Sequence, residues 1–161
     1  MMKIRHICKL TVLLTLLAGT HVMGQDGQPG MEESRQTLQA GKEQIIRAEL
    51  RLSDDEAAAF WPLYHSYQSD LQVVRDRYAD LLTKYLDAYR AGTVSEELAD
   101  QIVDDYLEMQ GDILQIKKRH LADFREALPS RKAARFYQLE NKMEAALQGQ
   151  LAETIPLIDP V

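Results

Sequence analysis

Cysteine is nearly absent from this chain of 161 residues, because the only one is Cys8, close to the N-terminus. A disulfide needs two thiols, and thiol catalysis, thiolate metal sites and CxxCH haem attachment all need a cysteine in the folded part of a chain. The sequence beyond the N-terminal segment therefore excludes all four. A domain of this size without disulfides must depend on its hydrophobic core for stability.

Histidine is scarce too, and beyond the first 24 residues only His65 and His120 remain. The best arrangement for a metal is His120 with Asp123, which lies one helical turn further on. His120, however, falls on an apolar stripe between Ile116 and Phe124, where a core or interface histidine is favoured over a ligand. We therefore predict no metal site, with His120 and Asp123 as weak candidates, and no other cofactor.

Strand-like alternation and glycine-rich phosphate loops are also missing, which predicts an all-α fold. No nucleophile has a neighbouring base that would activate it. The carboxylates of Asp104, Asp105, Glu108 and Asp112 follow the spacing of a helix surface and are best explained as a solvated acidic face. We therefore do not expect an enzyme.

The N-terminal segment has the pattern of a secretory signal peptide. A basic stretch, MMKIRHICK, is followed by the apolar run LTVLLTLLAG and by VMG, an acceptable cleavage site before Gln25. The apolar run has about half the ~20 residues that span a bilayer, so cleavage is favoured over an uncleaved membrane anchor. We predict a signal peptide over residues 1–24 and a flexible leader over 25–31.

The charge balance is acidic, with 19 Lys and Arg against 25 Asp and Glu and a net charge of −6. Cleavage would remove Lys3, Arg5 and Lys9 and no acid, which changes the net charge to −9. Nucleic acid is a poor partner for a chain of that charge. The remaining length fits a single helical domain, expected over residues 32–155, followed by a tail over 156–161.

Apolar periodicity and helix-capping residues predict four helices. The first covers residues 32–50. The second starts at the capping box Ser53 to Glu56, runs to Ala91 and is expected to kink at Pro62. Its stripe steps by three and four residues through Phe60, Tyr64, Tyr67, Leu71, Val74, Tyr78, Leu81, Tyr85 and Ala88 or Tyr89.

A second capping-box pair, Thr93 and Glu96, predicts a third helix that continues to about Ala127. The fourth is expected over residues 130–154, since Pro129 precedes it and Pro156 follows it. Two long helices joined by a short turn form an antiparallel hairpin. At ~1.5 Å per residue the second helix is nearly 60 Å long, so we expect an elongated four-helix molecule.

Two stretches of the chain read almost alike: LSDDEAAAFWPL from Leu52 and LPSRKAARFYQL from Leu128. Each has a leucine before a helix start, small alanines in the first turns and an aromatic pair two turns in. Pro129 replaces Ser53 and Lys132 replaces Glu56 in the second copy, so the packing residues repeat and the capping box does not. Two helix starts with similar neighbours would explain the repeat on structural grounds alone.

The repeat resembles the paired LTxxQ motifs of small exported α-helical proteins of the Spy, CpxP and ZraP-like group. In that group each motif opens a helix. Leu52, Ser53 and Glu56 resemble a conservative variant of the first motif, with Ser for Thr and Glu for Gln, and Leu128 and Ser130 belong to a degraded second one. The resemblance implies a curved helical dimer in the periplasm. It further implies an ATP-independent chaperone, a partner of a stress-sensing kinase or a metal-linked stress protein.

We therefore expect a periplasmic, non-catalytic protein-binding protein of the envelope-stress type, with protein clients or an envelope sensor as partner and a homodimer as assembly. The residues predicted to bind protein are Phe60, Trp61, Tyr78, Tyr85, Arg131, Arg135, Phe136 and Tyr137. Five tyrosines on one stripe are more polar than a buried seam tolerates, although dimer or intramolecular packing is favoured over client contact. The alternatives are a metal-binding or metal-sensing protein and a structural module with one dedicated envelope partner.

Overall fold

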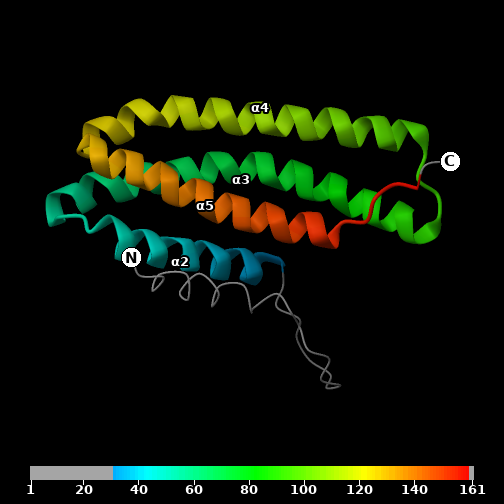
Figure 1. The fold of residues 1–161 in the computed structure, drawn as a ribbon, viewed down its shortest axis with the longest axis horizontal. Coiled ribbons are helices and arrows are strands. Elements are labelled where there is room, and N and C mark those ends of the chain that lie inside the picture. The colour runs from blue at the N-terminus through cyan, green and yellow to red at the C-terminus, as the bar shows by residue number, and fades with distance from the viewer. Residues whose placement is uncertain (1–30, 160–161) are drawn as a thin grey trace, which may run out of the picture. The chain divides into compact units, whose positions relative to one another are not determined.

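A computed structural model describes residues 31–159 of the chain, so the predicted signal peptide and nearly all of the predicted leader lie outside the described residues. Within residues 31–159 the fold is all-α, as predicted, with four helices and no strand (Figure 1). The helices are α2 (Met31–Leu50), α3 (Asp54–Ala91), α4 (Glu96–Ala127) and α5 (Ser130–Thr154).

The chain divides into two compact units, Met1–Arg51 and Leu52–Val161, and α2 belongs to the first. This helix has the predicted extent and runs through Gly41 without interruption. It ends before Arg51, whose φ of 49° lies in the left-handed region and cannot continue a helix. Leu50 and Ile46 are buried, whereas Leu38 is partly exposed. A single domain over residues 32–155 stays a prediction.

The start of α3 confirms the predicted capping box. The Glu56 N–H donates to Ser53 Oγ at 3.3 Å, and the Ser53 N–H donates to Glu56 Oε2 at 2.7 Å. Asp54 and Asp55 add negative charge to the first turn, where it favours the helix dipole. The helix then continues for 38 residues through Pro62. The ring of Pro62 is exposed, and the predicted kink stays a prediction.

The predicted cap of α4 at Thr93 is wrong by two residues. Gly92 ends α3 with φ 67°, and the Thr93 N–H donates to the Ala88 carbonyl at 2.9 Å. Thr93 is therefore part of the C-terminal cap of α3. Ser95 is the N-cap of α4 instead, and its Oγ accepts from the Leu98 N–H at 3.2 Å. Helix α4 therefore begins at Glu96. This glutamate lies in the first turn of the helix and does not form the predicted capping box with Thr93.

In the second unit, α4 runs antiparallel to α3. Arg77 of α3 pairs with Glu108 and with Asp112, and Asp70, about two turns earlier on α3, pairs with Arg119, later on α4. Helix α5 turns back again and lies along α3 in the parallel direction (Figure 1).

Contacts between α3 and α5 recur along both helices. Gln68 Nε2 donates to Glu140 Oε2 at 3.2 Å in the buried interface. Arg75 Nη2 pairs with Glu144 Oε2 at 2.6 Å, and both side chains are largely shielded from solvent. Charged groups that are partly buried and paired in this way fix the register of two helices, because a shift would leave them unpaired.

An aromatic cluster forms the core at the end of the unit where α4 turns into α5. Its members are fully buried and come from all three helices: Phe60, Tyr64, Tyr67, Phe124 and Phe136. The Phe124 and Phe136 ring centroids are 4.5 Å apart, and Phe60 and Phe136 meet edge to face at 5.2 Å. Burial of such a ring contributes about 1.5–3 kcal/mol, with a further ~0.5–1.5 kcal/mol from each favourable ring pair.

Replacement of Phe136 tests how much the aromatic cluster contributes to stability. Phe136→Ala removes a ring that contacts all three helices of the unit, so we expect the free energy of unfolding to fall by about 3–5 kcal/mol. Urea unfolding followed by circular dichroism measures the change. Leu157→Ala is the control, because Leu157 is 88% exposed and its loss should change stability by less than ~0.5 kcal/mol. A small effect of Phe136→Ala would contradict the cluster's role.

Candidate functional site

The two repeated stretches lie against each other. Lys132 Nζ pairs with Glu56 Oε2, and the Phe136 ring meets the Phe60 ring, so both contacts join residues that are equivalent in the repeat. The hydrogen bond from Lys132 is the main cause of a lowered pKa of the Glu56 carboxyl, and the hydrogen bond from the Ser53 N–H lowers this pKa further. The second copy has a lysine where the first has a glutamate. The contact between these equivalent residues is therefore an ion pair, whereas two glutamates would repel each other.

The second copy starts its helix without a side-chain cap. Pro129 is the N-cap of α5 and makes no side-chain hydrogen bond, while its carbonyl accepts from the N–H groups of Lys132 and Ala133. Helix α5 begins at Ser130 as predicted. Leu128, ahead of it, is buried, and the equivalent Leu52 is half-buried. The residues of both motifs therefore have a structural role in the described chain: they start α3 and α5 and pack these helices together.

Each aromatic pair of the repeat has one fully buried ring and one half-buried ring. Phe60 and Phe136 face the core and are fully buried, so they do not form a protein-binding surface. Trp61 is half-buried, with its ring edge-on to Phe60 at 5.1 Å. Tyr137 is half-buried and donates its O–H to the Lys117 carbonyl at 2.9 Å, which ties α5 to α4. Burial raises the pKa of Tyr137 to about 12.

The tyrosine stripe of α3 is buried at one end and open at the other. Tyr64 and Tyr67 are in the core, and burial raises the pKa of Tyr67. Tyr85 is also buried, which does not fit its predicted contact with a client. The reason is the C-terminal tail, since the Tyr85 O–H donates to the Pro156 carbonyl at 2.7 Å.

Three tyrosines remain accessible towards the far end of the unit. Tyr106 of α4 is 42% exposed and Tyr89 of α3 is 37% exposed. Tyr78 is half-buried beside Tyr106, with ring centroids 5.9 Å apart. Tyr78 and Tyr89 are 11 residues apart, about three helical turns, and therefore share a face of α3. We call Tyr78, Tyr89 and Tyr106 the tyrosine surface.

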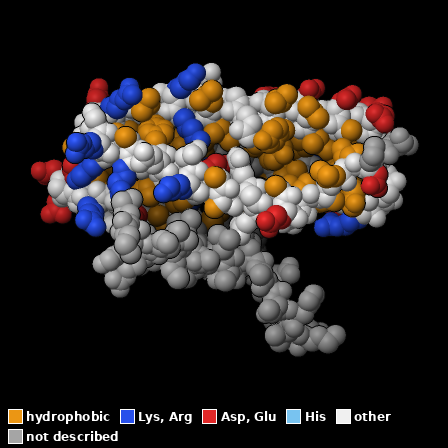
Figure 2. All heavy atoms as spheres, viewed as in Figure 1, with side chains coloured by type: hydrophobic (Ala, Val, Ile, Leu, Met, Phe, Trp, Pro, Cys, Tyr) orange, Lys and Arg blue, Asp and Glu red, His pale blue; other side chains and the backbone are white. Residues whose placement is uncertain are grey.

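The tyrosine surface stays accessible because α4 and α5 contact each other close to the turn that joins them. Phe124 meets Phe136 and Tyr137 there, and Tyr137 binds the Lys117 carbonyl. Figure 2 shows a broad area of hydrophobic side chains over the half of the unit that holds the C-terminal part of α3 and the N-terminal part of α4. Acidic side chains surround this area on the same face.

The predicted binding residues do not form one surface. Arg131 and Arg135 are exposed in the first two turns of α5, beside the aromatic cluster. Lys and Arg side chains gather over that half of the unit (Figure 2). Tyr78 lies in the other half, so a basic patch and an aromatic surface are present, but they are separate.

Three exposed apolar residues of α4 were missed by the sequence analysis. Val103, Leu107 and Leu114 are 57%, 62% and 50% exposed. They form a second series, spaced by four and seven residues, beside the inner series that continues through Met109, Ile113 and Ile116. The sequence contains this second series, and its spacing is the signal that could have identified it. We call Val103, Leu107 and Leu114 the outer stripe.

The weak metal candidates differ in burial and in their partners. His120 is buried, and its Nε2 lies 2.7 Å from Asp70 Oδ2, while Arg119 Nη2 lies 2.9 Å from the same oxygen. The hydrogen bond with His120 is the main cause of a lowered pKa of the Asp70 carboxyl. Asp123 is exposed on α4. Over residues 31–159 we find no cluster of three His, Cys, Asp or Glu that could hold a metal ion.

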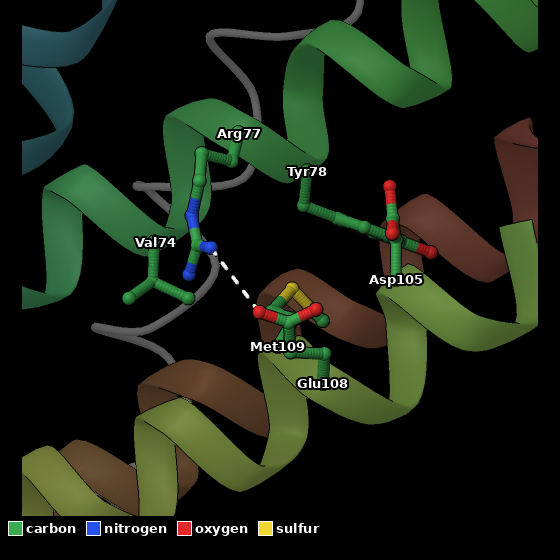
Figure 3. Close-up of a pocket in the computed structure, with 6 residues that line it drawn as sticks. All are labelled: Val74, Arg77, Tyr78, Asp105, Glu108 and Met109. Carbon is green, nitrogen blue, oxygen red and sulfur yellow. Dashed lines mark hydrogen bonds and ion pairs between the residues drawn. The ribbon is translucent and has the colours of Figure 1, made fainter. Parts of the chain in front are cut away.

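A small pocket lies between α3 and α4 (Figure 3). Val74, Arg77 and Tyr78 line it from α3, and Asp105, Glu108 and Met109 line it from α4. Arg77 Nη1 reaches Glu108 Oε1 at 3.4 Å across the opening. With a volume of about 70 Å³ the pocket can hold a few water molecules, whereas sites for drug-sized ligands are about 300–1,000 Å³.

Comparison with known proteins gives no assignment: no family model, no curated protein and no solved structure matches the chain. Among the helices of the described residues, none combines the length and apolar character needed to cross a membrane. The resemblance to the Spy and CpxP group therefore stays a prediction.

The Asp70 carboxylate predicts a pH dependence of stability. Its pKa is lower in the folded than in the unfolded chain, so ionised Asp70 stabilises the fold at pH values above its unfolded pKa of about 3.9. This contribution to the free energy of unfolding is lost as the pH falls through the folded pKa. Asp70→Asn should therefore destabilise the protein at pH 7 and cost less near pH 3. Urea unfolding at both pH values measures this, with exposed Asp80→Asn as control. An equal loss of stability in Asp70→Asn at both pH values would contradict a stabilising role for the ionised carboxylate.

The Glu56 to Lys132 ion pair predicts the effect of a charge reversal. Lys132→Glu would place two carboxylates at the contact between the repeats, raising the pKa of Glu56 and lowering the melting temperature. Lys142→Glu is the matched control, since Lys142 is exposed on the same helix. Thermal unfolding compares the two variants. Equal melting temperatures would show that the contact between the repeats has no electrostatic part.

Proposed function

We propose that the chain is an exported, non-catalytic protein-binding protein of the envelope-stress type, acting in the periplasm as an ATP-independent chaperone or as a stress-signalling regulator. The signal-like N-terminal segment and the resemblance of the two motif stretches support this proposal. We further propose the elongated four-helix hairpin arrangement that the helix lengths and the short turn predict and that is similar to the Spy and CpxP group. The observation that carries the proposal is the tyrosine surface.

The tyrosine surface has the chemistry of a protein-binding site. A tyrosine presents a large apolar ring with a polar end and loses little conformational entropy on contact, because it has only two side-chain torsions. Tyr78 and Tyr106 already support each other through their ring contact, so they are partly preorganised. The small pocket beside them does not offer an enclosed site for a small molecule. A polypeptide segment is the ligand that fits such an open, aromatic surface.

Charges around the surface favour weak and reversible contact. Asp105 and Glu108 lie next to Tyr78, and Arg77 is already paired with Glu108. A client that docks on the tyrosines would meet exposed, solvated charges, which steer binding but add little affinity. Affinity of this kind suits a chaperone without a nucleotide cycle, since clients must be able to leave.

Light scattering from a chemically denatured client diluted into buffer tests the proposal. The purified protein should suppress scattering, and addition of zinc or of a chelator should make no difference. Suppression that requires zinc would favour the metal-binding alternative. Absence of suppression under every condition would contradict the chaperone function and leave a regulator with one dedicated envelope partner.

A pair of variants assigns the activity to the tyrosine surface. Tyr106→Ser removes an exposed ring at the surface and should weaken client binding about tenfold, since its burial contributes about 1.5 kcal/mol. Val73→Ser is the matched control, because Val73 is 64% exposed on α3 but is outside the tyrosine surface. Titration of the scattering signal gives both affinities. Equal losses in the two variants would show that the tyrosine surface is not the binding site.

A further inference from the structure

The segment that follows α5 lies against α3 as an extended chain. Helix α5 ends at Thr154, and Ile155 has extended backbone angles, φ −81° and ψ 119°. Pro156 comes next and has no N–H with which to continue the helix. From there the chain runs towards the turn that joins α3 and α4 (Figure 1). We call residues 155–159 the extended segment.

A hydrogen bond joins the extended segment to the tyrosines of α3. The Tyr85 hydroxyl donates to the Pro156 carbonyl at 2.7 Å. The Tyr85 ring is only 2% exposed and lies beside the Tyr89 ring, with centroids 6.0 Å apart. Burial, followed by Tyr89 and the Asp159 carboxylate, raises the pKa of the Tyr85 hydroxyl, so this group stays protonated and can donate. The contact therefore adjoins the tyrosine surface at Tyr89.

The side chains of the extended segment divide into an inner pair and an outer pair. Ile155 and Pro156 are half-buried, whereas Leu157 is 88% exposed and Ile158 is 42% exposed. The segment is therefore held by two half-buried residues and one main-chain carbonyl, and the Leu157 side chain contributes little. Such a contact is weak by itself and is maintained because α5 keeps the segment close to its site.

Proline suits this position for a chemical reason. Pro156 brings a carbonyl acceptor without an N–H, so the donor Tyr85 satisfies its backbone and no N–H is left over. Another residue would bring an N–H that needs a partner when it is half-buried. Proline also fixes φ near −65°, which keeps the segment extended before contact and lowers the entropy cost of docking.

From these observations we infer that Tyr85 and Tyr89 form a peptide-binding site, which this chain fills with its own extended segment. The ligand class is an extended segment of another protein with an aliphatic residue before a proline, and the carbonyl of that proline replaces the Pro156 carbonyl at Tyr85. Release of the chain's own segment uncovers Tyr85, which lies two turns from Tyr78 and one turn from Tyr89, and so enlarges the tyrosine surface. The inference rests on the proposed function, because it names the ligand and the regulation of the same surface.

A spin label on the extended segment measures its release in the whole chain. The background is Cys8→Ser with Leu157→Cys, because Leu157 is exposed and the chain then has a single thiol for a nitroxide. The spectrum should be mainly that of a docked, slowly moving label. Tyr85→Phe keeps the ring and removes the donor, so it should raise the ratio of mobile to docked segment about fivefold.

Tyr89→Phe is the matched control, because the Tyr89 hydroxyl makes no hydrogen bond within residues 31–159 and its loss should leave the ratio unchanged. A mobile label before either substitution would overturn the inference. Equal ratios in Tyr85→Phe and Tyr89→Phe would overturn it as well.

A synthetic peptide tests the ligand class on the same labelled protein. The peptide ETIPLID, residues 153–159, should displace the extended segment with a midpoint of about 1 mM, since short tethers give effective concentrations in the millimolar range. The Leu157→Ser peptide should compete equally well. The Pro156→Gly peptide should compete about tenfold less well, because its glycine brings an unpaired N–H. Absence of displacement, or equal competition by the Pro156→Gly peptide, would contradict the ligand class.

Client scattering separates this inference from the proposed function. Pro156→Gly in the whole chain releases the segment and leaves Tyr85 able to donate, so it should suppress scattering at a lower protein concentration than Leu157→Ser or the wild type does. Equal suppression by all three proteins would overturn regulation by the segment and leave the chaperone function in place. Displacement of the labelled segment by peptide, in a protein that never suppresses scattering, would instead support the peptide site and contradict the chaperone function.

Discussion

The contact of Phe136 with Phe60 and Phe124 is the interaction on which the rest of the second unit depends. It is the place where α3, α4 and α5 meet, and its three rings are fully buried. From this end α4 runs away antiparallel to α3, and α5 runs along α3 with its register set by Gln68 with Glu140 and by Arg75 with Glu144. Packing at this end joins the three helices, and the polar contacts between α3 and α5 set how they lie along each other.

The same geometry separates a closed end of the unit from an accessible one. Near the aromatic cluster, α4 and α5 are in contact through Phe124, Phe136 and Tyr137. Towards Tyr78 and Tyr106, aromatic rings are left partly in water. The unit buries its three phenylalanines together with Tyr64 and Tyr67 at one end and leaves the tyrosine surface accessible at the other. Its aromatic residues are thus divided between stability and surface chemistry.

The sequence predicted the helices well, because their starts and ends are encoded locally. Ser53 and Glu56 form the capping box that was expected, and Gly92 ends α3. The start of α4 was placed two residues early, since Thr93 and Ser95 are both acceptable caps and only the bond from the Thr93 N–H to α3 distinguishes them. This bond spans only five residues and belongs to the helix end at Gly92, so the glycine was a local signal that could have excluded Thr93 as the cap.

The candidate site was predicted less well, because exposure depends on distant parts of the chain. Tyr78 and Tyr85 look equivalent on the stripe of α3, yet Tyr85 is covered by the segment at Pro156, 71 residues away. The spacing of Val103, Leu107 and Leu114 was present in the sequence, but their exposure is evident only from the fold. The repeat was recognised, whereas the contact of its two copies required the fold.

Native-state hydrogen exchange tests most directly whether the two ends of the second unit differ in local stability. The account predicts that amides around Phe60, Phe124 and Phe136 open only with global unfolding, whereas those around Val103 and Tyr106 open at a lower free energy. Equal protection along the whole of α4 would contradict it, because the two ends of the unit would then be equally well packed.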